Sequence, residues 1–212
     1  EEVARILIQR DGIESKLAHQ VAAEAQSHIG MARRLATSSE ARSRRRETLL
    51  AALAITGVTS AVNTAERWLE IAKKDAEALT LEKDSEEKES LLRSLGLAAG
   101  DTIPVNLRVD IKALEEAQKR RATRSVRDGL DRILVDLLSL YRDVMTLQIS
   151  AEVALVNEDL RNSITEVANS STPAETIAKL DAIAEARTRI DSNVRDLMVL
   201  EALAVQLRRK SN

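Results

Sequence analysis

The chain has 212 residues, no cysteine, and 32 Lys and Arg against 34 Asp and Glu, for a net charge of −2. The absence of cysteine excludes disulfides, thiolate nucleophiles and Cys-ligated zinc, and the balanced charge gives no overall preference for a polyanionic partner. Aromatic residues make up 1% of the sequence, with 6 Gly and 2 Pro. Aliphatic side chains must therefore form the core, and the composition predicts an all-α fold.

The sequence contains no segment suited to a membrane. Its longest apolar run, residues 49–55, is far shorter than the roughly 20 residues that cross a bilayer, and no secretory signal follows the N-terminus. We therefore expect no membrane partner and a cytoplasmic location. The sequence begins with Glu-Glu in the middle of a helical pattern, so we expect it to be a fragment of a longer protein.

Residues 1–40 are predicted to form three short helices and one compact domain. The first helix ends at Gly12, which suits the left-handed cap position. The second ends near Ser27, which we expect to cap the third, and the third contains Gly30 and Arg33. We place a domain boundary here, with a larger helical bundle in residues 41–212.

The bundle begins with a basic helix and a second, longer one. Thr37 and Glu40 have the spacing of a capping box, which predicts a helix start. The four arginines between residues 42 and 46 follow, and we expect them to be solvated. Gly57 precedes a long helix whose apolar repeat lapses in residues 82–90, EKDSEEKES. This acidic segment indicates a solvated face or a hinge.

Residues 120–148 give the clearest helical pattern. Residues 120–148 belong to a long predicted helix, and the Gly, Asp and Pro content of residues 98–104 predicts a loop before that helix. The apolar residues recur at a spacing of three and four, which is typical of a helix with one buried stripe. The stripe consists of Val126, Leu130, Ile133, Leu134, Leu137, Leu138, Tyr141, Val144 and Met145.

The C-terminal part is predicted to hold a short helix over residues 158–168 and one last long helix. Pro173 suits the first turn of that last helix, which we expect to continue to Lys210. The predicted architecture is thus a three-helix domain followed by a bundle with two or three long helices. Its last helix is the candidate contact to another subunit, because four apolar residues cover more than one of its faces. They are Leu197, Val199, Leu200 and Leu203.

Motifs for catalysis are missing from the sequence. Neither histidine has a Glu three residues before it, as a di-iron bundle requires, and serine hydrolase, phosphate-loop and dinucleotide motifs are absent. Glu24 and His28 are four residues apart and could share a metal ion, but histidines in such Ala-rich helices are more often surface or packed residues. We therefore expect no metal site and no enzyme activity in this chain.

A basic stripe lies at the start of the 120–148 helix. It could meet phosphates or an acidic partner, and this leaves a free-standing helical adaptor or nucleic-acid-binding bundle as an alternative function. Four neighbouring acids (Glu115, Glu116, Asp128 and Asp131) and the lack of an aromatic platform favour a solvated, self-neutralised face instead. The basic stripe comprises Lys119, Arg120, Arg121, Arg124 and Arg127.

Three segments resemble one protein family. QSHIGMARRLA, residues 26–36, resembles the sensor-2 helix in the lid domain of AAA+ clamp-loader proteins, where a Gly followed three residues later by Arg places a guanidinium at the nucleotide pocket. Gly30 and Arg33 match that spacing. RRATRSVRDGLDRILVDLLSLYRDVM and RIDSNVRDLMVLEALAVQLRR are similar to the collar domain of the delta-prime family of bacterial DNA polymerase III. Together these resemblances imply a lid in residues 1–40 and a collar in the rest of the chain.

This resemblance implies a non-catalytic part of a clamp-loader subunit. In the family, collar domains hold together a ring that places the sliding clamp on primer-template DNA during DNA replication. The implied partners are the other loader subunits through the collar, and the sliding clamp and primer-template DNA through the whole assembly. A DNA-directed DNA polymerase label would describe the holoenzyme.

The resemblance also implies where a cofactor would bind. Arg33 is the implied cofactor-binding residue, with an arginine merely on the lid surface as the alternative. The fragment itself implies no cofactor. ATP enters only with the AAA+ domain, which this sequence lacks, and with neighbouring subunits.

Overall fold

The computed structural model describes residues 1–26, 28–97, 104, 108–192 and 194–209, and these residues form helices and their connections without a strand. The all-α prediction is confirmed. Within these ranges, no helix combines the length and the apolar character needed to cross a membrane. The predicted cap Ser27, most of the predicted loop over residues 98–104, and Lys210 lie outside the described residues.

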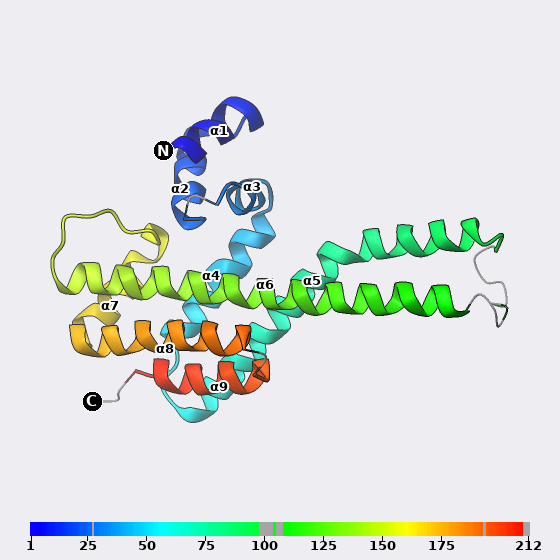
Figure 1. The fold of residues 1–212 in the computed structure, drawn as a ribbon. Coiled ribbons are helices and arrows are strands. Elements are labelled where there is room, and N and C mark those ends of the chain that lie inside the picture. The colour runs from blue at the N-terminus through cyan, green and yellow to red at the C-terminus, as the bar shows by residue number, and fades with distance from the viewer. Residues whose placement is uncertain (27, 98–103, 105–107, 193, 210–212) are drawn as a thin grey trace. The chain divides into compact units, whose positions relative to one another are not determined.

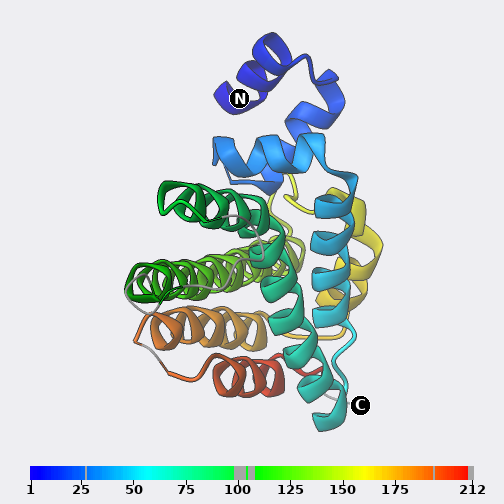
Figure 2. The same ribbon diagram turned by 90° about the vertical axis from the view of Figure 1, so that its right-hand side faces the viewer.

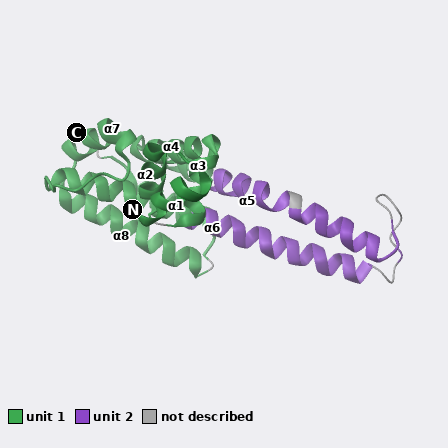
Figure 3. Ribbon diagram, turned by 90° about the horizontal axis from the view of Figure 1, so that it is seen from above, with its two compact units in different colours: residues 1–68, 132–212 green, residues 69–131 purple. Residues whose placement is uncertain are grey.

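The chain divides into two compact units, which Figure 3 shows in different colours. Unit 1 contains residues 1–68 and 132–212, and unit 2 contains residues 69–131. The helices α5 (Val58–Ser94) and α6 (Arg108–Gln148) each contribute residues to both units. The boundary that the sequence indicates after residue 40 is a different division, and it stays a prediction.

Unit 1 begins with the short helices α1 (Glu2–Asp11), α2 (Ser15–Glu24) and α3 (Ile29–Thr37) (Figure 1). Gly12 ends α1 with φ at 67°, and its N–H donates to the carbonyl of Leu7, so the predicted left-handed cap is confirmed. The three helices share one apolar core with the start of the next helix. This core consists of Ala4, Leu7, Ala18, Val21, Ala22, Ala25, Ala32, Leu35, Ala36 and Ala41.

Helix α4 (Ser39–Leu53) starts one residue later than the capping-box pattern indicates. The cap is Ser38, whose Oγ accepts the N–H of Ala41 at 3.1 Å. Thr37 is still the last residue of α3, and its hydroxyl donates to the carbonyl of Arg33. The prediction of Thr37 as the cap is wrong because Ser38, with φ −115° and ψ 109°, has the extended backbone that the cap position requires.

The part of α6 within unit 1 is buried on more than one side. Lys179 lies over the ring of Tyr141, and the side-chain amide of Gln148 donates to the carbonyl of Ser171. The predicted apolar stripe is therefore one part of a wider buried surface. The wider surface adds four polar residues, Asp136, Ser139, Asp143 and Thr146.

The last long helix that the sequence predicts after Pro173 is two helices in the structure. A 3₁₀ turn (Glu158–Leu160) leads into α7 (Arg161–Asn169), and α8 (Pro173–Asp191) is followed by a separate α9 (Asp196–Leu207). The break allows α9 to pack alongside α8 in both views (Figures 1 and 2). A capping box of Thr172 and Glu175 starts α8, with the predicted Pro173 in its first turn.

The packing of α9 corrects the predicted subunit contact. Leu200 is 0% exposed and Leu203 is 1% exposed, so both belong to the core of unit 1. Met198, in contrast, is 58% exposed. The apolar residues that cover several faces of α9 serve to pack this helix inside the unit, and only its outward face is left for a partner.

Unit 2 contains the antiparallel parts of α5 and α6, which are joined by polar contacts between residues 84–88 and residues 115–121. Arg121 bonds to Asp84 and Glu87, and Lys88 lies 3.7 Å from Glu115. A hypothetical Cβ on Gly129 would lie 3.3 Å from the Cβ of Ala72, so the helices approach closely there. Helix α5 runs through residues 82–90 without interruption, so the lapse in the apolar repeat is not a break in the helix.

The burial of Leu200 predicts a large loss of stability on truncation. We expect Leu200→Ala to lower the free energy of unfolding by about 2–5 kcal/mol, through lost apolar contacts and a residual cavity. Met198→Ala, two residues away but exposed, should change it by about 0.5 kcal/mol or less. Urea denaturation followed by circular dichroism measures both. Equal effects of the two substitutions would contradict the placement of α9.

Candidate functional site

The predicted nucleotide contact, Arg33, lies on α3 and faces α1. Its Nε donates to Asp11 Oδ2 at 2.7 Å and its NH2 group donates to Asp11 Oδ1 at 3.0 Å. These bonds raise the pKa of Arg33 above its usual value. The pair fixes the direction of the guanidinium and leaves its NH1 group unbonded to Asp11. A role for Arg33 in nucleotide binding stays a prediction.

Glu24 and His28, the pair that could share a metal ion, have separate structural roles. His28 caps α3, and its Nδ1 accepts the N–H of Met31 at 3.3 Å. Glu24 is buried and accepts a hydrogen bond of 2.8 Å from Gln20. Among the residues that the structure describes, no group of three or more His, Asp or Glu could hold a metal ion.

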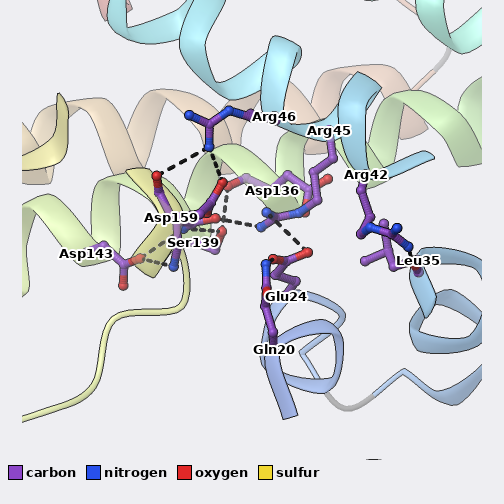
Figure 4. Close-up of polar contacts among 11 residues, drawn as sticks. Gln20, Glu24, Leu35, Arg42, Arg45, Arg46, Asp136, Ser139, Asp143 and Asp159 are labelled. Carbon is purple, nitrogen blue, oxygen red and sulfur yellow. Dashed lines mark hydrogen bonds and ion pairs between the residues drawn. The ribbon is translucent and has the colours of Figure 1, made fainter. Parts of the chain in front are cut away.

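Glu24 belongs to a buried polar network centred on Arg45 (Figure 4). Arg45 is 8% exposed; its Nε donates to Asp136 Oδ1 at 2.9 Å, and its NH2 group donates to Asn157 Oδ1 at 2.6 Å. Its NH1 group lies 3.8 Å from Glu24 Oε2. One guanidinium therefore joins α2, α4, α6 and the segment before α7. We define the buried polar network as Glu24, Arg45, Asp136, Ser139, Asp143 and Asn157.

Asp143 completes the buried polar network by holding the chain segment that follows α6. It is 0% exposed and accepts the backbone N–H groups of Val156 at 3.1 Å and Asn157 at 2.7 Å. The side-chain amide of Asn157 also donates to Asp143 and to Ser139. Asn157 thus donates to one carboxylate while it accepts from Arg45, and its position is fixed from both sides.

Two carboxyl groups, those of Glu24 and Asp136, share the single positive charge of Arg45. Burial raises the pKa of Glu24 above its usual range, and the nearby Arg45 and Gln20 only partly oppose this effect. Burial likewise raises the pKa of Asp136, against the lowering effect of Arg45. Both acids therefore favour the protonated form more strongly in the folded protein than in the unfolded chain.

The basic run on α4 is only partly solvated: Arg46 is exposed, Arg42 and Arg44 are half-buried, and the prediction is wrong for Arg45, which is buried. Besides Arg45, Arg42 donates to the carbonyls of Leu35 and Ala36 at the end of α3. Arg46 forms an ion pair with Asp159. These contacts arise because α4 lies against α3 and α7 and meets α6 at Asp136. The signal available in the sequence was Asp136, Ser139 and Asp143, polar residues at helical spacing within the apolar pattern of α6.

The basic stripe on α6 divides between two environments. Arg121 faces α5, with hydrogen bonds of 2.8 Å to Asp84 and 3.0 Å to Glu87. Lys119, Arg120 and Arg124 are exposed. The acidic segment of α5 thus neutralises Arg121. Spacing along α6 does not indicate this pairing, because the acids belong to another helix.

Comparison with known proteins gives one partial similarity. A stretch of 79 residues is 37% identical to a protein of Bacillus subtilis (strain 168) named DNA polymerase III subunit delta'. The stretch covers 37% of this chain and 23% of that protein, so the chain matches less than a quarter of its relative. No protein-family model matches the chain, and no solved structure matches it.

Removal of Arg45 should strongly destabilise the fold. We expect Arg45→Met to lower the free energy of unfolding by about 3–5 kcal/mol, because it leaves buried carboxylates without their cation. Arg5→Met is the control, since Arg5 is exposed and lies 3.8 Å from Glu2 within the same helix; it should cost less than about 1 kcal/mol. Guanidinium denaturation measures both. A small effect at Arg45 would show that the network does not secure unit 1.

The raised pKa of Glu24 predicts an unusual pH dependence. As pH rises above the ordinary value of 4.5, the unfolded chain releases this proton first, so the contribution of Glu24 to the unfolding free energy falls. Glu24→Gln removes that contribution. The unfolding free energy of Glu24→Gln minus that of the unaltered chain should therefore increase from pH 5 to pH 7, as measured by denaturant titration. A difference that stays constant, or that decreases, would contradict the raised pKa.

Proposed function

We propose that this chain is the lid and collar portion of a clamp-loader subunit of the delta-prime type, and that it helps to hold the loader ring together. The observation that carries this proposal is the 79-residue stretch that is 37% identical to DNA polymerase III subunit delta'. The all-helical architecture agrees with it. The partners in this proposal are the other loader subunits, with the sliding clamp and primer-template DNA reached through the whole cytoplasmic assembly.

The chain has a structural task in this proposal. ATP would enter through an AAA+ domain outside this sequence and through neighbouring subunits, and any polymerase activity would belong to the holoenzyme. The buried polar network supports such a task, because Arg45 ties Glu24 of α2 to Asp136 of α6. A displacement of the lid-like helices would therefore be passed to the helices of the bundle.

The outward face of α9 is the contact surface in this proposal. Leu200 and Leu203 are buried within unit 1 and are unavailable to a partner. Met198 is 58% exposed, and Val194, just before the helix, is 41% exposed. Apolar side chains at such positions lose contact with water when a second subunit covers them, and this favours association.

Assembly of the loader tests both the function and the surface. We expect Met198→Glu to fold normally and to weaken association of the full-length subunit with the other loader subunits of its organism by about 10- to 100-fold, because a charge replaces a desolvated apolar contact. Gln206→Glu adds the same charge at another exposed position of α9 and serves as the control. Analytical ultracentrifugation reports the complexes.

The two parts of the proposal fail in different ways. If the unaltered full-length subunit does not join the other loader subunits, the proposed function is wrong. If Met198→Glu assembles as well as the unaltered subunit, only the assignment of the α9 face is wrong.

A further inference from the structure

Most of the basic side chains of α6 in unit 2 take no part in the ion pairs between α5 and α6. Arg121 is bonded to Asp84 and Glu87, and Glu115 lies 3.7 Å from Lys88. Spacing along α6 suggests that Glu115 neutralises a basic residue of α6. In the structure Glu115 lies near Lys88 of α5 instead. Charge neutralisation in unit 2 therefore occurs mainly between the helices, on the side where they meet.

Five cations remain on the side of α6 that faces away from this contact. Within the described part of the chain they form no ion pair. Four of them are exposed, and Arg127 is half-buried. At 1.5 Å per residue the row extends for about 22 Å. We define the outer basic face as Lys112, Lys119, Arg120, Arg124 and Arg127.

The acids near the outer basic face are fewer than its cations. Asp110, Glu116 and Asp128 are exposed beside it, and Asp131 follows at its end, which gives four acids against five cations. Neither Glu116 nor Asp128 lies within ion-pair distance of these cations in the part of α6 that the structure describes. The face therefore keeps a positive excess at its exposed surface and suits an extended polyanion.

The chain has no exposed Trp, Tyr or Phe on which bases could stack. Its one Trp and one Tyr are Trp68 and Tyr141, which are 0% and 1% exposed, and it has no Phe. Stacking of bases on Trp, Tyr or Phe rings is therefore not the basis of contact at the outer basic face. Arginine and lysine on an exposed helix can instead bind phosphates, whatever the sequence of the bases.

We propose that the outer basic face binds the phosphate backbone of nucleic acid, without sequence preference. Double-stranded DNA carries one phosphate per about 1.7 Å of its axis, so a row of about 22 Å can meet several phosphates at once. The contact depends on the charges of unit 2 and is independent of ring assembly. It should therefore be present in the isolated chain.

Salt-dependent DNA binding by the whole chain tests the proposal. Fluorescence anisotropy of a fluorescein-labelled 20-base-pair duplex is measured between 50 and 200 mM NaCl. If about four phosphates are contacted, the affinity should fall about 100-fold across this range. The variant Lys119→Gln/Arg120→Gln/Arg124→Gln should bind at least about tenfold more weakly at 50 mM, and its logarithmic salt slope should be less steep by about 2–3.

A matched control separates this face from overall charge. Arg5→Gln/Arg10→Gln/Lys16→Gln also removes one lysine and two arginines, all exposed but on α1 and α2. It should stay within about twofold of the unaltered chain and keep its salt slope. Circular dichroism confirms that both triple variants are folded.

Three results would overturn the proposal. The first is no binding of the duplex at 50 mM NaCl, and the second is an equal loss of affinity in both triple variants. The third is tight binding of labelled poly-L-glutamate without binding of the duplex, which would assign the outer basic face to an acidic protein.

Discussion

The fold of unit 1 depends on the burial of one guanidinium, that of Arg45. A charge in the interior is unfavourable unless it is paired and hydrogen-bonded, and Arg45 meets this condition only where four separate segments converge. Asp136 supplies the closest carboxylate, Asn157 an amide oxygen at 2.6 Å, and Glu24 a second carboxylate at 3.8 Å. The Arg45 side chain therefore favours contact between α4 and α6, and it also specifies the register in which the two helices meet.

The same network links the N-terminal helices to the rest of unit 1. Glu24 belongs to α2, and the side chain of Gln26, just after α2, donates to the carbonyl of Val135 on α6. Separation of α2 from α4 and α6 would part Glu24 from Arg45 and leave Arg45 with one fewer carboxylate. Arg33 is bonded to Asp11 within the N-terminal helices, and these are the helices that Glu24 and Gln26 connect to the rest of unit 1.

Local signals in the sequence predicted the helical class and several helix ends, but they were insufficient for the contacts between helices. Gly12 and Pro173 were located correctly, because a left-handed cap and a first-turn proline depend on neighbouring residues alone. The break between α8 and α9 was missed, because apolar residues continue on both sides of it and only the packing of α9 on α8 requires it. Arg45 was missed because arginines 42, 44, 45 and 46 look alike in the sequence, and only the partner residues on α6 distinguish the buried one.

Unit 2 shows why neighbouring residues of one type can have different roles. Spacing along α6 suggests pairs such as Glu116 with Arg120, each worth a few tenths of a kcal/mol on an exposed helix. The contact between α5 and α6 competes with these local pairs, and Arg121, held between Asp84 and Glu87, gains two charged partners at once. Arg120 differs from Arg121 by about 100° around the helix axis and faces solvent. The acids of α5 cannot reach it, and its charge is left for an external polyanion.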